Sequence, residues 1–236
     1  MNQTLIAAFL RQRAGSPARL VLALAFFVFP LLFLSFARGV GLAPLKTAAA
    51  FALFLGAGLI GQDVSSGTLQ LLFARPVTRS EYALSRWLGA ALGASCLAMV
   101  QIAIGVALLA LHDEAPAARD LALFAGEQIL SAFGTTSVLL LFSTLLPGVG
   151  DFLALFATGF VGQALQPAGA LLKAPWLTRA GEEVGRFAGA GLELARLFAG
   201  GPVSWFEVVS YVSTVTLCLA LGIAILNRRE LSYATE

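Results

Sequence analysis

Few residues of this sequence have the side-chain types and spacing that enzymatic chemistry needs. Ser95 and the sole histidine, His112, lie about one apolar run apart, and His112 falls at the end of that run, where water reaches it. Cys96 follows Ser95, whereas an intramembrane serine protease places a glycine after its nucleophile. No His-Glu-x-x-His sequence, carboxylate pair or other catalytic constellation is present. We therefore predict that the chain is not an enzyme.

Patterns for binding nucleotides, metals and nucleic acids are missing as well. The phosphate-binding sequence G-x-x-x-x-G-K-[ST] does not occur anywhere in the chain. Cys96 and Cys218 lie singly within apolar runs and indicate neither a metal site nor a disulfide framework. The net charge of +2 provides no electrostatic footprint for nucleic acid. We predict that this chain itself binds no metal or cofactor.

Two acidic residues stand out because they fall inside apolar runs. Glu127 and Glu207 each lie in a segment that is otherwise suited to the bilayer. A charge at the membrane centre costs about 2.5–3.5 kcal/mol on insertion scales, so such residues are functional candidates by default. Each could instead lie near a helix end, at the interface with water, and the sequence leaves both interpretations open.

The composition predicts an all-α protein with six transmembrane helices. Of 236 residues, 58% are hydrophobic and 12% are charged, and the mean hydropathy is +0.87. A soluble domain carries about 25% charged residues, and a span needs about 20 apolar residues. We predict a single transmembrane domain over residues 1–236, with spans at about 19–37, 45–61, 84–111, 120–146, 151–166 and 203–226.

Two further segments have helical periodicity but are too polar to span. Residues 1–18 place Leu5, Ile6, Phe9 and Leu10 at helical spacing, with Arg11 and Arg13 behind them, which indicates an amphipathic helix on the membrane surface. Residues 167–203 alternate an apolar stripe with charged positions and indicate an amphipathic segment on the side opposite the termini. We also expect Asp151 to cap the helix that it begins.

The distribution of basic residues predicts the orientation. With six spans both termini lie on one side, which holds eight Lys and Arg residues against seven on the other, and around the first hairpin the ratio is six to two. Because cytoplasmic loops carry the excess of Lys and Arg, we expect both termini in the cytoplasm.

The longest polar stretch between the first spans has a distinctive order of residues. Ser65 and Ser66 can cap a helix, Gly67 permits close approach of a partner, and Pro76 ends the helix. The order is Gln62-Asp63-Val64-Ser65-Ser66-Gly67-Thr68-Leu69, then Leu71-Leu72, then Arg75-Pro76-Val77-Thr78-Arg79, and finally Arg86. The alternative interpretation is an ordinary solvated loop that joins two helices.

This stretch resembles the loop between the second and third helices of the type-2 ABC transporter permeases, many of which are exporters. Their pattern is an acidic stretch, Gly-Thr, a leucine run, a Pro-Val-Ser/Thr-Arg turn and a basic residue that opens the third helix. Here only Asp63 represents the acidic stretch, and Arg86 stands where lysine is commoner. The specific motif covers about 25 residues, whereas the predicted layout is similar along the whole chain, with residues 1–18 as an elbow helix.

The resemblance implies a role, partners and a location. It implies that residues 62–81 form a cytoplasmic coupling helix that docks in a groove of an ATPase subunit. The contact residues would be Asp63, Ser66, Gly67, Thr68, Leu69, Leu72, Arg75, Pro76, Arg79 and Arg86. Two separate ATP-binding subunits would hold ATP and Mg²⁺, and a second copy or a homologous permease would complete a dimer in the bacterial cytoplasmic membrane.

In that family the translocation path runs between two protomers and is lined largely by the second and fifth helices. Carried over, this implies lining by Phe51, Phe54, Leu55, Phe152, Phe156, Phe160 and Gln163. An aromatic, uncharged lining would suit a lipophilic or amphipathic substrate, but these phenylalanines could equally face lipid or pack in the core. The alternative function is a secondary transporter or channel that is not powered by ATP, which would be expected to show inverted repeats or broken helices.

Overall fold

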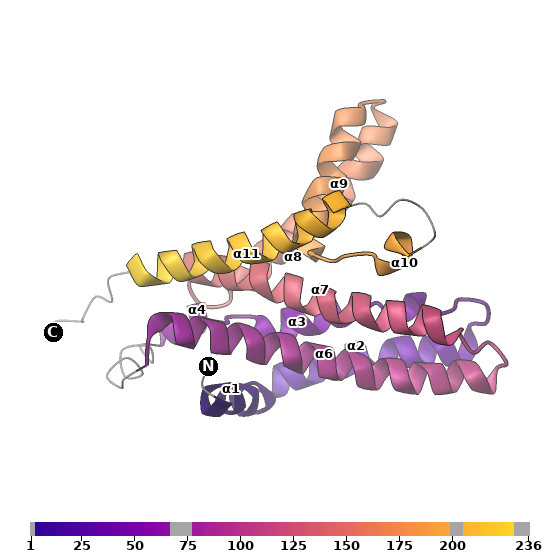
Figure 1. The fold of residues 1–236 in the computed structure, drawn as a ribbon, viewed down its shortest axis with the longest axis horizontal. Helices are drawn as coiled ribbons and strands as arrows, with labels where there is room; N and C mark the ends of the chain where they lie inside the picture. Colours follow the sequence, from indigo (N-terminus) through magenta and orange to yellow (C-terminus); the bar gives the residue numbers. More distant parts are fainter. Residues whose placement is uncertain (1–2, 67–76, 199–204, 229–236) are drawn as a thin grey trace.

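The computed structural model describes residues 3–66, 77–198 and 205–228, and the described residues form helices joined by short connections, without a strand (Figure 1). This confirms the all-α prediction. Five of the described segments are long and apolar enough to cross a membrane. The five segments indicate a multi-pass membrane protein.

The first two helices lie beside α6 (Arg79–Leu111). Helix α1 (Gln3–Ala14) buries Phe9, which is 1% exposed, and α2 (Pro17–Phe36) is the first candidate span. The Arg13 side chain turns inward and is 2% exposed, which the sequence did not predict. Since Arg13 lies four residues after Phe9, the two share one helical face, and the guanidinium finds partners there.

The second span is interrupted near its C-terminal end. It consists of η1 (Ala43–Leu45), α3 (Ala48–Gly56) and α4 (Gly61–Ser65), with residues 57–60 between α3 and α4 outside helical geometry. The sequence predicted a span at 45–61, which is confirmed as part of a candidate span over Ala43–Ser65. The interruption was not predicted.

Helices α6 and α7 (Ala118–Leu145) form the centre of the bundle, and α3 packs against both. Thr78 and Glu81 form a capping box at the start of α6, which satisfies two backbone N–H groups of the first turn. Buried Gln101 of α6 donates to the carbonyl oxygens of Phe26 and Phe27 in α2, at 3.0 and 2.8 Å. An amide between two spans thus replaces water as the partner of backbone groups.

Helix α8 (Gly150–Leu171) and α9 (Pro175–Gly189) form a tight antiparallel pair that projects away from the other helices (Figure 1). A Cβ added to Gly162 would lie 2.7 Å from the backbone nitrogen of Gly185, so the two backbones touch through glycine. Helix α9 is strongly amphipathic, as predicted within 167–203.

Helix α8 corresponds to the predicted fifth span at 151–166, but it is not one of the five candidate spans of the described residues. The polar amides of Gln163 and Gln166 and the helix-interior Pro167 interrupt its apolar sequence. The expectation that Asp151 caps this helix was wrong, because Val149 is its N-cap residue.

The first and last described helices reach the same end of the bundle, which we call the terminal end (Figure 1). Short α10 (Leu194–Leu197) precedes α11 (Trp205–Arg228). The last turn of α11 lies beside the start of α6, where the Arg79 guanidinium donates to the carbonyl oxygens of Leu226 and Asn227 at 2.8 and 3.0 Å. Because α7 ends at the terminal end and α11 begins at the opposite end, the chain must return between them. Helix α8 makes the first part of this return, and the segment from Ala190 through α10 makes the rest, with the Phe198 carbonyl oxygen accepting from Arg119 near the start of α7.

Candidate functional site

The interruption between α3 and α4 leaves backbone groups without partners in their own helix. Gly58 has a φ of +67°, a conformation that side chains disfavour, and a Cβ there would lie 3.0 Å from the carbonyl oxygen of Gly148. Inside a membrane each unsatisfied backbone group costs several kcal/mol. The partners of residues 57–61 therefore decide whether this break is stable.

The freed N–H groups are held by side chains of α7 and α8. Gly58 and Leu59 donate to the Asp151 carboxylate at 2.8 and 3.2 Å. Ile60 and Gly61 donate to the Ser143 hydroxyl oxygen at 2.8 and 2.9 Å. Asp151 and Ser143 are both fully buried. Four consecutive N–H groups thus end on two polar side chains that come from helices far along the sequence.

Arginines of α1 and α2 hold the freed carbonyl groups. Arg13 donates to the carbonyl oxygens of Ala57 and Gly58 at 2.6 and 2.8 Å. Arg19, at the start of α2, donates to Ala57 at 3.1 Å and to the Gln62 side-chain oxygen at 2.8 Å. A planar guanidinium can bind two neighbouring carbonyl oxygens at once, which a lysine cannot do in the same way.

Arg13 is charged although it is buried. Desolvation by burial, with a smaller contribution from the charges of Arg19 and Arg86, lowers the pKa of the Arg13 guanidinium to about 9. At pH 7 the group is therefore still protonated. The Phe9 ring lies 4.9 Å from the Arg13 guanidinium carbon, so an aromatic face replaces part of the lost hydration.

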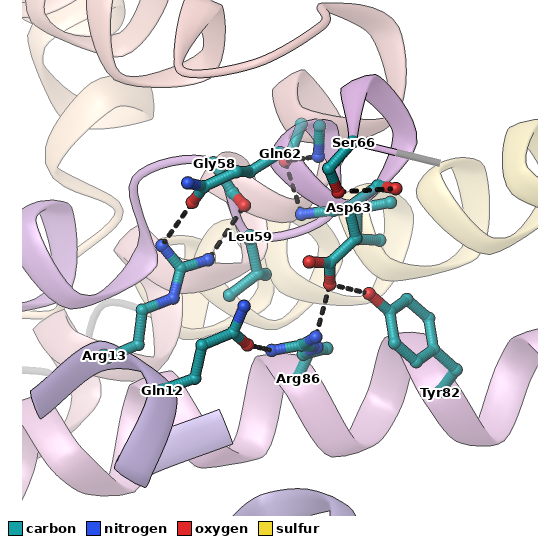
Figure 2. Close-up of polar contacts among 12 residues, drawn as sticks. Gln12, Arg13, Gly58, Leu59, Gln62, Asp63, Ser66, Tyr82 and Arg86 are labelled. Atoms are coloured by element: carbon teal, nitrogen blue, oxygen red, sulfur yellow. Dashed lines mark hydrogen bonds and ion pairs between the residues drawn. The ribbon is translucent and has the colours of Figure 1, made fainter. Parts of the chain in front are cut away.

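A second cluster lies one turn along α4, next to the break (Figure 2). Asp63 forms a buried ion pair with Arg86 of α6 and accepts a hydrogen bond from the Tyr82 hydroxyl. Arg86 also donates to the Gln12 side-chain oxygen of α1 at 2.9 Å, and its guanidinium lies over the rings of Phe9 and Tyr82. Figure 2 shows α1, α4 and α6 meeting at these side chains.

The described ends of the stretch 62–86 are both bonded to helices. Asp63 lies near its start on α4, and Arg79 and Arg86 lie toward its end on α6. Arg79 is bonded to the end of α11 and Arg86 to Asp63, so both flanks of the loop are attached to other helices. A displacement at the loop would act on α1, α6 and α11 together.

Of the residues that the resemblance assigned to ATPase coupling, the structure brings Asp63 and Arg86 together and places Arg79 against α11. The Ser66 hydroxyl donates to the Asp63 carbonyl oxygen at 3.4 Å. Gly67, Thr68, Leu69, Leu72, Arg75 and Pro76 lie outside the described residues.

Sequence reasoning missed several members of the site, among them Arg13, Tyr82, Ser143 and the role of Asp151 at the break. The spacing of Arg13 from Phe9 was the available signal for its inward position. Ser143 stands in an apolar run with no pattern that marks it as a ligand for backbone groups.

The residues expected to line a translocation path fall into two sets. Phe51 is fully buried and Phe54 is 8% exposed, and their rings pack against Phe27 and Phe26 of α2. On α8, Phe156 and Phe160 are 60% and 67% exposed. Two ring contacts join the sets, Phe54–Phe152 and Phe152–Phe156, each with centroids 6.2 Å apart. Leu55 is half-buried and Gln163 is exposed.

Glu127 and Glu207, the two acidic candidates from the sequence, each line a cavity. Glu127 is 9% exposed and accepts a hydrogen bond from the Ala195 nitrogen at 2.8 Å. Glu207 is half-buried in the first turn of α11. Within residues 3–66, 77–198 and 205–228, no three His, Cys, Asp or Glu residues are grouped closely enough to hold a metal ion.

No protein-family model matches the chain, and no curated protein matches it at a significant level.

Proposed function

We propose that this chain is the membrane-spanning permease subunit of an ATP-binding cassette transporter, and that residues 62–81 couple it to a separate ATPase. The observation that carries the proposal is the attachment of this loop at both ends, through a buried ion pair at Asp63 and through partly buried hydrogen bonds at Arg79. Asp63 and Arg86 attach it to α6 and α1, and Arg79 attaches it to α11. A loop built only to join two helices has no need for a buried ion pair, because such a pair costs desolvation.

Because of these contacts, a movement of the loop would be passed on to other helices and would not stay confined to the loop. A partner that pushes on the loop acts through Asp63 on Arg86, and through Arg86 on Gln12 of α1. The same α4 begins at the break held by Asp151 and Ser143, so movement of α4 also acts on α7 and α8. In this proposal ATP-driven closure of two ATPase subunits moves the loops, and the break in the second span absorbs the change.

A second copy of the chain, or a homologous permease, completes the proposed transporter. Phe156, Phe160 and Gln163 are spaced by four and three residues, so they share one face of α8. All three are exposed, and the amide of Gln163 would be costly against lipid. In this proposal the face packs across a dimer axis, and the path runs between the two protomers. In this arrangement the terminal end faces the cytoplasm of a bacterial cell, and the transporter works as an exporter.

The test is co-purification from the native host. We expect an ATP-binding subunit to be recovered with the tagged chain after mild detergent extraction, identified by mass spectrometry. Gly67→Glu should lower this recovery by about tenfold or more, because it introduces a charge into the proposed docking surface. Ala115→Glu, which adds the same charge to the exposed loop at the opposite end, is the control.

Both variants must insert and solubilise as the unaltered chain does. Equal recovery of the ATPase with Gly67→Glu and Ala115→Glu would contradict the coupling role of the loop. Recovery of no ATP-binding protein with the unaltered chain would favour the secondary transporter or channel instead.

A further inference from the structure

The tip of the α8–α9 hairpin, residues 171–176, exposes large apolar side chains and projects away from the other helices (Figure 1). Leu171, Leu172 and Trp176 are 84%, 70% and 68% exposed. Exposed apolar side chains that occur singly are ordinary, whereas a group of them marks a surface that contacts a partner or a membrane. The tip therefore has the character of a contact surface.

The two helices behind the tip hold it in place. A Cβ added to Gly169 would lie 2.6 Å from the Thr178 nitrogen, so the two backbones touch close to the turn as well as at Gly162. Lys173 completes the turn in the left-handed region, with a φ of +51°. Because helices that touch through glycine pack tightly, the tip has little freedom to fold back onto the bundle. Its apolar side chains are thus a fixed part of the protein surface.

The length and the lean of α8 determine how deep the tip lies in the membrane. Helix α8 has 22 residues and is therefore about 33 Å long, similar to the thickness of the hydrocarbon core. It begins at the terminal end, where Asp151 binds the break in the second span, and it leans away from the other helices (Figure 1). A leaning helix rises by less than its own length. The tip therefore stays at the level of the far leaflet and does not reach beyond the membrane.

The charges near the tip are complementary to phospholipid. Residues 152–181 include no acidic residue, and their charged side chains are Lys173 and Arg179, which are both exposed. Tryptophan is enriched at the level of the lipid headgroups, and long basic side chains next to it can reach the phosphates. The first acidic residues of α9, Glu182 and Glu183, line the hollows beside α7 and α11 instead. The hairpin thus separates a basic, apolar tip from an acidic base.

We propose that this tip binds the phospholipid surface of the leaflet opposite the terminal end. Leu171, Leu172 and the Trp176 ring enter the outer part of the acyl chains. Lys173 and Arg179 bind lipid phosphates from the headgroup side. The bilayer thereby anchors the outer end of a hairpin that projects from the bundle.

The lipid-binding tip is separate from the proposed dimer contact and from the proposed coupling loop. Leu171 lies about 12 Å further along α8 than Gln163, so a second protomer packed on Gln163 need not cover the tip. The proposal requires that the chain lies in a membrane, and it requires neither an ATPase nor a cargo.

The test measures the surroundings of a nitroxide spin label in the full-length chain, reconstituted in vesicles of phosphatidylcholine and phosphatidylglycerol. The label is attached to Leu172→Cys after the two native cysteines have been replaced by alanine. Its collisions with oxygen, which collects among acyl chains, are compared with its collisions with a polar nickel chelate present on both sides of the membrane. The control is the same label at Glu182→Cys, an exposed position of the hairpin that lines a hollow. We expect the ratio of oxygen to nickel collisions to be about tenfold or more higher at position 172, because hydrocarbon excludes the polar chelate.

Each possible occupant of the tip gives a different result. A second copy of the chain would shield the label from both reagents and broaden its spectrum through coupling between two labels. Water would make the collision ratio at position 172 equal to that at Glu182→Cys. Either of these results would overturn the proposal.

A second variant tests the contact with phosphate. Lys173→Glu should lower the collision ratio at position 172 by about twofold or more, because lipid phosphates repel the introduced carboxylate. Lys173→Arg, which keeps the charge, should leave the ratio unchanged. An equal ratio in both variants would contradict the role of Lys173. Size-exclusion profiles and thermal unfolding that match those of the cysteine-free chain establish that each variant is folded, and the assay contains no ATPase, so its outcome is independent of the coupling test.

Discussion

Replacing Asp63 with alanine should lower the free energy of unfolding by about 3–5 kcal/mol, the usual cost of removing one partner of a buried ion pair. The Asp63 side chain is 5% exposed and that of Arg86 is 10% exposed, so the pair is largely shielded from water. The substitution removes the acceptor of both Arg86 and Tyr82 and leaves a nearly buried guanidinium with Gln12 as its hydrogen-bond partner. The assay is unfolding by SDS, which is titrated into dodecyl maltoside micelles that contain the protein. Tryptophan fluorescence is the signal.

The double variant Asp63→Ala/Arg86→Met separates an ion pair from general packing. Replacing both partners of a buried pair with apolar groups is often close to neutral, because the desolvation cost disappears with the charges. We therefore expect the double variant to be more stable than Asp63→Ala alone. A loss below about 1 kcal/mol for the single variant, or a double variant whose loss equals the sum of both single losses, would refute the reasoning.

Two further changes test the break in the second span. Asp151→Asn should lower the free energy of unfolding by about 1–3 kcal/mol in the same assay, because one amide oxygen replaces two carboxylate oxygens as acceptors of buried N–H groups. The exposed control Asp120→Asn should change the free energy of unfolding by no more than about 0.5 kcal/mol. Arg13→Met should release α1 from the bundle and increase its cleavage by added protease, and Arg11→Met, an exposed arginine of the same helix, should not. Unchanged cleavage of Arg13→Met would contradict the anchoring role of that arginine.

Five of the six predicted spans coincide with candidate spans of the described residues, because apolar runs and turn residues mark them directly, whereas the span predicted at 151–166 is not among them. The break could not be predicted, since residues 45–61 form an apolar run without proline and its glycines are common in membrane helices. The partners that stabilise the break come from Arg13, Ser143 and Asp151, up to 93 residues away in the sequence. Such pairings depend on the assembled fold.

The candidate site was predictable in part. The order of residues in the loop drew attention to Asp63 and Arg86, but their pairing across 23 residues required the geometry of α4 and α6. The cavity beside Glu127 was beyond sequence reasoning, because its walls come from four helices and from the segment after α9. Glu127 itself was identified from its place in an apolar run, although the sequence left open whether it lay at an interface.

The dependence of the break on distant side chains has a consequence for how the protein is made. When residues 43–65 leave the ribosome and enter the bilayer, neither Ser143 nor Asp151 has been synthesised. An uninterrupted helix satisfies its own backbone at that stage, and lipid offers residues 57–60 no alternative partner. The second span should therefore insert as a continuous helix and be remodelled after synthesis has passed Asp151. Biogenesis of this protein would then include a late, post-insertion conformational change within a span that had already crossed the membrane.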